Sequence, residues 1–133
     1  MRWDAVMTAV KDTALADPII VGIIGTAGRL AGTGPHQVPL LEWSLIADTE
    51  DELWAPCTIQ WDLWVHTIEA QITLERQLRR LFHAELPVNL AGVRMWSQYV
   101  DGATLASPDR DGYYGRALRF RFTPLRDLYA GTP

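Results

Sequence analysis

The segment 57–66 shows the strictest alternation of apolar and polar residues in the chain, and it constrains the fold more than any other feature. Apolar residues occupy one set of alternate positions, and hydroxyl, amide, charged and aromatic groups occupy the other. This period of two predicts a long β-strand that is buried on one face. The apolar face consists of Cys57, Ile59, Trp61, Leu63 and Val65, and the opposite face of Thr58, Gln60, Asp62, Trp64 and His66.

An amphipathic helix over 67–83 is predicted to follow this strand directly. Thr67 is a suitable N-cap, and the charges run from acidic to basic along the axis, as the helix dipole favours. We expect the apolar stripe of the helix to face the same core as the strand. That stripe consists of Ile68, Ile72, Leu78, Leu81 and Phe82.

The remaining segments add one more helix, a flexible arm and further strands. A helix is predicted over 3–16, and Asp17-Pro18 ends it because a residue before proline avoids helical geometry. The apolar run 19–24 fits either a short helix or a buried strand. Glycines at 25–35 predict a flexible arm with a short strand around Arg29 and Leu30. Further strands are expected at 41–45, 93–100 and 118–122, with a loop over 101–115.

Together these elements predict an α+β fold with an antiparallel sheet of about four strands, including a long β-hairpin, and helices packed on one face. A chain of 133 residues fits a single such domain over 1–125, with the glycine-rich arm at 25–35 and a flexible C-terminal tail at 126–133. We expect neither a secretory signal nor a membrane span, because the longest apolar run is short.

No motif for catalysis, cofactor binding or metal binding is recognisable. The glycines at 22–34 match neither the dinucleotide fingerprint nor the P-loop. Asp62, His66 and Glu69 span the strand-to-helix junction, but no second histidine follows at helical spacing, so a surface histidine is the simpler interpretation. Cys57 is interpreted as a core thiol because it lies on the apolar strand face. We therefore expect no enzymatic activity, no cofactor and no metal.

The charged residues favour association with other protein chains. The net charge is −4, which argues against a general nucleic-acid binder. All basic residues except Lys11 are arginines, which form bidentate pairs across interfaces, although the codon preference of a GC-rich genome explains this equally well. An acidic turn at 48–52 is separated along the chain from the arginine-rich strands. Copies of such a chain can pair head to tail and close into a ring.

Six tryptophans in so short a chain also point to covered surfaces. Trp43 and Trp61 fall on apolar strand faces, whereas Trp64 and Trp96 project from polar faces and Trp54 lies near the acidic turn. A partner subunit is the simplest cover for these side chains. The candidates for subunit interfaces are Trp64, Trp96, Arg119, Arg121, Asp48, Glu50, Asp51 and Glu52.

The order of these segments resembles the tail-terminator (tail-completion) proteins of long-tailed bacteriophages. The resemblance rests on the first helix ending at Asp17-Pro18, the glycine-rich loop, the sequence VPLLEW at 38–43, and the strand TIQWDLWVHT at 58–67 running into a helix. It extends from about Val6 to Phe122, and it includes no catalytic motif.

The resemblance implies a small subunit of a virion that forms a ring, usually a hexamer, at the head-proximal end of the tail tube after assembly in the host cytoplasm. The ring would stop tube polymerisation and offer a docking surface to the head. Its partners would be further copies, the tail tube protein and a connector or neck protein, with no membrane, and DNA would pass through the lumen without specific binding. The arm and the 101–115 loop are candidates for axial contacts, through Gly28, Arg29, Gly32, Asp109 and Arg110.

Three alternatives are considered. Another head–tail connector, such as a neck or head-completion protein, would also form a ring. An RNA-binding α+β domain is suggested by YYGRALRFRF at 113–122, which resembles an aromatic RNA-reading strand, but Phe120 and Phe122 share the face of Leu118 and the net charge is negative. An enzyme with a site assembled from scattered groups ranks last.

Overall fold

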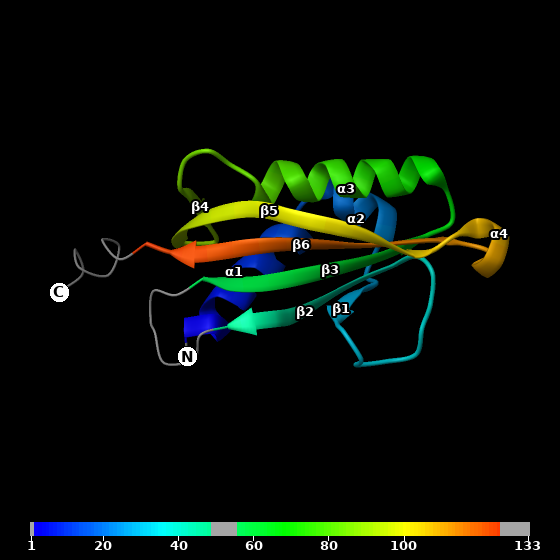
Figure 1. Ribbon diagram of the computed structural model, residues 1–133, viewed down its shortest axis with the longest axis horizontal. Coiled ribbons are helices and arrows are strands. Elements are labelled where there is room, and N and C mark those ends of the chain that lie inside the picture. The colour runs from blue at the N-terminus through cyan, green and yellow to red at the C-terminus, as the bar shows by residue number, and fades with distance from the viewer. Residues whose placement is uncertain (1, 49–55, 126–133) are drawn as a thin grey trace.

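The computed structural model describes residues 2–48 and 56–125, although the side chains of residues 2–4, 47 and 48 are not described. Figure 1 shows a curled sheet with α1, α2 and α3 on one face and α4 at the tip of a long hairpin. The helices are α1 (Arg2–Leu15), α2 (Pro18–Ile24), α3 (Ile68–Phe82) and α4 (Pro108–Asp111). The strands are β1 (Gly28–Leu30), β2 (Leu40–Asp48), β3 (Cys57–Val65), β4 (Val88–Leu90), β5 (Val93–Ala106) and β6 (Tyr114–Pro124).

The sheet has six strands in the order β1-β2-β3-β6-β5-β4, so the expectation of about four antiparallel strands is wrong. β1 pairs in parallel with β2, and the other neighbouring strands are antiparallel. The expected short strand at Arg29 and Leu30 is confirmed, and it lies along the edge of β2. The mixed α+β class and the single small domain are also confirmed.

The expected loop over 101–115 is largely strand and helix. β5 continues to Ala106, α4 forms the tip, and β6 begins at Tyr114. Bulges between Tyr99 and Asp101 and between Thr104 and Ala106 shift the register, so the period of two is lost from the sequence although the pairing continues. In Figure 1 this long hairpin extends beyond the rest of the sheet.

The ambiguous segment 19–24 is helical because Asp17 and Pro18 begin a helix there. Asp17 Oδ1 accepts hydrogen bonds from the backbone N–H groups of Ile19 at 3.0 Å and Ile20 at 3.1 Å, and Pro18 occupies the first turn. Asp17 Oδ2 also accepts a hydrogen bond of 2.7 Å from Gln77 Nε2. One carboxylate therefore caps α2 and fixes it against α3.

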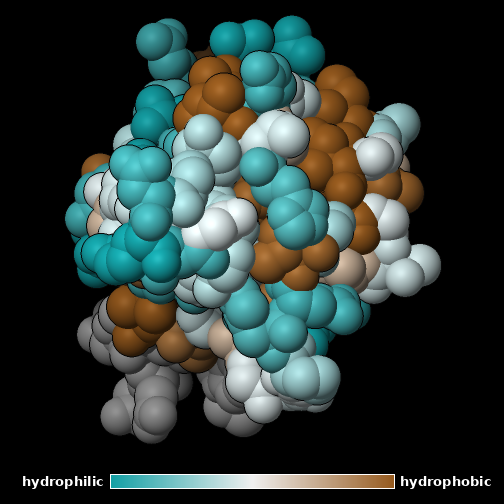
Figure 2. Space-filling model, turned by 90° about the vertical axis from the view of Figure 1, so that its right-hand side faces the viewer, coloured by the Kyte–Doolittle hydropathy of each residue, from teal (hydrophilic) through white to brown (hydrophobic). Residues whose placement is uncertain are grey.

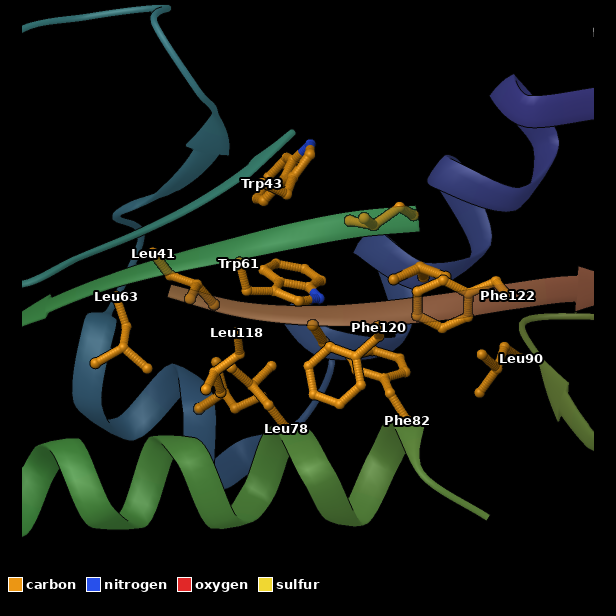
Figure 3. Packing of buried hydrophobic residues seen from close by; sticks show 14 of the residues in the cluster. Leu41, Trp43, Trp61, Leu63, Leu78, Phe82, Leu90, Leu118, Phe120 and Phe122 are labelled. Carbon is orange, nitrogen blue, oxygen red and sulfur yellow. The ribbon is translucent and has the colours of Figure 1, made fainter. Parts of the chain in front are cut away.

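The core lies between the sheet and the helices and centres on aromatic rings (Figure 3). Trp61 from β3 stacks on Phe82 from α3 with ring planes 8° apart and centroids 5.9 Å apart. Phe120 and Phe122 of β6 meet the same Phe82 ring edge-on. These side chains are fully buried, as the alternation in 57–66 and 118–122 predicts.

The helix α3 begins as expected but faces the core with different residues. The Thr67 hydroxyl accepts a hydrogen bond from the Ala70 N–H at 3.1 Å, which confirms the N-cap. The buried residues are Leu74, Gln77, Leu78 and Phe82. Ile68 and Ile72 are 39% and 46% exposed, so their assignment to the core stripe is wrong.

The C-terminal end of α3 is fixed to β5 through hydrogen bonds. Ser97, which is fully buried, donates its hydroxyl hydrogen to the carbonyl of Phe82. The N–H of Ala84 donates to the carbonyl of Ser97 at 3.1 Å, and the N–H of Tyr99 donates to His83 Nδ1 at 3.0 Å. These contacts satisfy backbone groups that a helix end leaves without partners.

Replacing Phe82 by alanine should lower the free energy of unfolding by about 3–5 kcal/mol, because a ring in contact with three others is lost from a closely packed core. Urea unfolding followed by tryptophan fluorescence measures the effect. The control is Leu86→Ala, whose side chain is 73% exposed and which should change stability by less than about 0.5 kcal/mol. Equal effects of the two substitutions would contradict this description of the core.

Candidate assembly surfaces

The face of the sheet opposite the helices carries a continuous set of polar side chains, which we call the outer sheet face. The register of β3 with β6 places Thr58 beside Arg121, and Gln60 beside Arg119. No helix in the described part of the chain packs on this face (Figure 1). It consists of Glu42, Ser44, Thr58, Gln60, Asp62, Trp64, Trp96, Gln98, Asp101, Arg119 and Arg121.

The two interface candidates on β6 differ in their partners. Arg119 Nε forms an ion pair with Asp101 Oδ1 at 2.9 Å, and both side chains are about half exposed. Arg121 is exposed and forms no ion pair with another described residue. The ion pair joins β6 to β5 within one chain, so Arg119 is already engaged, whereas Arg121 is available to a partner.

Two carboxylates lie directly opposite each other on β2 and β3. Glu42 pairs with Asp62 in the register, and Arg29 Nε contacts Glu42 Oε2 at 3.0 Å. Burial raises the pKa of Asp62, and the negative charge of Glu42 adds to this, while a 2.8 Å hydrogen bond from Gln60 Nε2 opposes it. The charge on Asp62 is therefore unfavourable in the folded chain.

Trp64 is covered by its own chain, whereas Trp96 is not. The ring of His36 meets Trp64 edge-on at 4.9 Å, and Tyr113 lies 6.1 Å from it. A Cβ on Gly115 would lie only 2.6 Å from the Trp64 ring, so glycine allows the indole to lie against β6. Trp96 is 38% exposed on the outer sheet face. Of these two interface candidates, Trp96 offers the larger surface to a partner.

The candidates for axial contacts fall into two separate regions. Gly28 and Arg29 belong to β1, and Gly28 is packed so closely that a Cβ there would lie 2.5 Å from Leu15. Gly32 is exposed with φ of 80°, a conformation that favours glycine. Asp109 and Arg110 lie on α4, at the tip of the long hairpin in Figure 1. The tip places these two exposed residues beyond the body of the sheet.

The acidic turn falls mainly outside the described residues. Asp48 is the last residue of β2, and its backbone pairs with Cys57. Glu50, Asp51 and Glu52, together with Trp54, are in the segment 49–55, whose placement is not described.

One surface was not anticipated from the sequence. The exposed side of α3 carries two isoleucines in its first half and three arginines in its second half, and Figure 2 shows apolar and polar surface side by side at the end where α3 begins. Arg79 lies over the ring of Tyr99, 3.9 Å from its centroid. The spacing of residues in the sequence could have revealed this surface. Every fourth residue from 68 to 80 lies on one side of the helix, and these residues are Ile68, Ile72, Arg76 and Arg80.

The possible metal ligands do not converge. Asp62 accepts a hydrogen bond from Gln60, and His66 Nε2 lies 3.2 Å from the carbonyl oxygen of Val38. Over residues 2–48 and 56–125, no group of three or more His, Cys, Asp or Glu side chains is arranged to hold a metal ion. Among the described helices, none has the length and apolar character needed to cross a membrane.

Comparison with known proteins identifies the fold. No protein-family model matches the sequence, and no curated protein matches it. A search of solved structures finds a chain in the virion of a native gene transfer agent (GTA) particle, with 16% sequence identity and a TM-score of 0.63. The match covers 90% of this chain and 93% of that chain, so the two folds are similar over almost their whole lengths.

Alanine at Trp64 and at Trp96 should have different consequences. Trp64→Ala should lower the free energy of unfolding by about 2 kcal/mol or more, because the substitution leaves a cavity beneath His36 and Tyr113. Trp96→Ala should lower it by clearly less, because more than a third of the indole is exposed and less apolar area is lost from contact. Urea unfolding at low protein concentration measures both values, and a reversed order would contradict the assignment.

Asp62→Asn should stabilise the protein at pH 7 by about a few tenths of a kcal/mol, because the carboxylate is only partly buried and solvent screens its charge. The folded pKa of Asp62 is raised, so its contribution to stability is fully present below the ordinary carboxyl pKa and is lost as the pH rises through the folded value. The difference in the free energy of unfolding between the variant and the wild type should therefore disappear near pH 3, where Asp62 is neutral. Chemical denaturation at both pH values provides the test, with Asp109→Asn as an exposed control. A stabilisation that persists at pH 3 would contradict the argument.

Proposed function

We propose that this chain is a structural subunit of a phage-like virion, and that it forms a ring at the head-proximal end of the tail tube. The observation that supports the virion assignment is the likeness to the gene transfer agent chain across nearly all of both chains. The finer assignment, a tail terminator that stops tube polymerisation and receives the head, rests on the order of sequence segments that resembles those proteins. The proposed activity is physical occlusion and docking, without a catalytic step.

The distribution of surface groups supports a subunit that assembles with copies of itself. An exposed arginine, Arg121, and an exposed tryptophan, Trp96, occur on the outer sheet face, and a set of three arginines occurs on α3. Interfaces between proteins are enriched in these two residue types. A hexamer is the stoichiometry expected from the resemblance, with the tube protein and a neck protein as axial partners.

A different head–tail connector, such as a neck or head-completion protein, is the second candidate, because it would also be a virion subunit that forms a ring. The RNA-binding alternative loses its main support. Phe120 and Phe122, which would have to stack on bases, are both fully buried against Phe82. Exposed aromatic rings on a sheet are the feature that such recognition needs, and these two rings are in the core.

The purified protein, mixed with tail tube protein from the same genome during tube assembly, should stop elongation and leave a ring at one end of each tube. The physical reason is that the ring covers the surface on which the next tube subunits would add. Light scattering gives the native mass, and negative-stain electron microscopy gives tube length and end structure. Tubes that grow to the same length with bare ends would exclude the terminator role. A ring that binds purified neck protein but not tubes would identify a different connector.

A further inference from the structure

We propose that the exposed side of α3 is a lateral contact surface that binds the acidic segment 48–54 of a neighbouring copy of this chain. We call this side the α3 face, and it consists of Ile68, Ile72, Arg76, Arg79 and Arg80. The inference rests on the proposed function, because it assigns two complementary surfaces to the contact between neighbouring subunits of the ring.

The α3 face holds cations that the chain itself leaves without carboxylate partners. Four other arginines are paired internally: Arg29 with Glu42, Arg110 with Asp111, Arg116 with Glu75 and Arg119 with Asp101. Arg76 and Arg80 form no ion pair with any described residue, and Arg79 lies against the Tyr99 ring. Three like charges at spacings of three and four residues repel one another on a helix. Carboxylates from a partner would relieve this repulsion.

Apolar surface lies immediately beside these cations. Ile72 is one helical turn before Arg76, and Ile68 is one turn before Ile72. Ile72 lines a shallow pocket of about 300 Å³ together with Glu75, Arg76 and Arg79. An apolar contact bordered by charged groups is the usual construction of a protein interface. The α3 face therefore fits a peptide segment that carries both carboxylates and apolar side chains.

The charge distribution across the sheet identifies a second copy as the partner. Residues 28–66, which supply β1, β2 and β3, contain one basic and six acidic residues. Residues 67–133, which supply β6, β5 and β4 together with α3, contain nine basic and seven acidic residues. The half of the sheet formed by β1, β2 and β3 is thus an acidic side, and the half with α3 is a basic side. Contact between unlike sides of two copies is heterologous and closes into a ring when the rotation allows.

Within the acidic side, the segment 48–54 has the composition that matches the α3 face. It contains four carboxylates in its first five residues and ends in two large apolar residues. The carboxylates would meet the arginines, and the apolar pair would cover the isoleucines. The residues of the segment are Asp48, Thr49, Glu50, Asp51, Glu52, Leu53 and Trp54.

The length of the connection keeps the segment away from the isoleucines of its own α3, so a segment that covers the whole α3 face comes from a neighbouring copy. β3 runs for nine residues from Cys57 before the chain turns into α3. Ile72 is therefore on the order of 20 Å along the strand direction from the point where β3 begins. A connection of seven residues between Asp48 and Pro56 extends on the order of 14 Å from its two ends. The segment is too short to cover the first half of its own α3.

Charge reversal tests the proposal directly. The double variant R76E/R80E should raise the dissociation constant for self-association by at least about tenfold, because it replaces attraction to the acidic segment by repulsion. Sedimentation velocity over a range of protein and salt concentrations measures the constant, and circular dichroism confirms that the monomer is folded. The matched control K11E/R94E makes the same change of charge at two cations that lie away from α3 and belong to no candidate interface, so it should have a much smaller effect.

A second substitution tests the partner segment. E50R/E52R should weaken self-association by a similar factor, and the combination of R76E/R80E with E50R/E52R in one chain should restore much of it, since the four substituted residues then have their charges exchanged. Unchanged assembly of R76E/R80E, an equal loss in K11E/R94E, or failure of the combined variant to recover would overturn the inference. Assembly of the wild-type ring in those cases would leave the proposed function standing. A wild-type chain that never self-associates, even on tubes, would overturn both.

Discussion

The stack of Trp61 on Phe82 is the interaction on which the rest of the structure depends. Trp61 is in the middle of β3, one of the two central strands, and Phe82 is the last residue of α3, so the contact fixes the far end of the helix over the centre of the sheet. Buried aromatic pairs in this offset geometry contribute beyond the area they cover. Because the buried side of α3 is held in this way, the opposite side, with its isoleucines and arginines, must face outward.

The fold could be predicted where the sequence has a regular period. The strand β3 and the segment 118–122 of β6 alternate strictly, and the helix between them begins at a recognisable cap. The prediction failed at the far half of β5, where two bulges break the alternation, and at β4, which has only three residues. It also failed for Ile72, because α3 has apolar residues on two sides and only packing against β3 and β6 decides which side is buried.

The assembly surfaces were less predictable than the fold, because they depend on contacts between distant residues. Trp64 alternates with core residues, so the pattern correctly placed it on the outer sheet face, but nothing local shows that His36 and Tyr113 cover it. Arg119 and Arg121 are equivalent by pattern, yet one is paired with Asp101 and the other is not. A sequence pattern gives the face on which a side chain lies, and the fold determines whether that side chain is already occupied.

This difference between paired and unpaired arginines matters for a subunit that must recognise its own copies. An arginine that already contacts a carboxylate in its own chain, such as Arg116 with Glu75, gains little by exchanging one partner for another. An arginine without such a partner, such as Arg76, gains a new interaction when a neighbour supplies the carboxylate, and apolar surface beside it excludes the water that would weaken that interaction. Internal ion pairs therefore hold the sheet together, while the unpaired cations of α3 are better placed to select a partner.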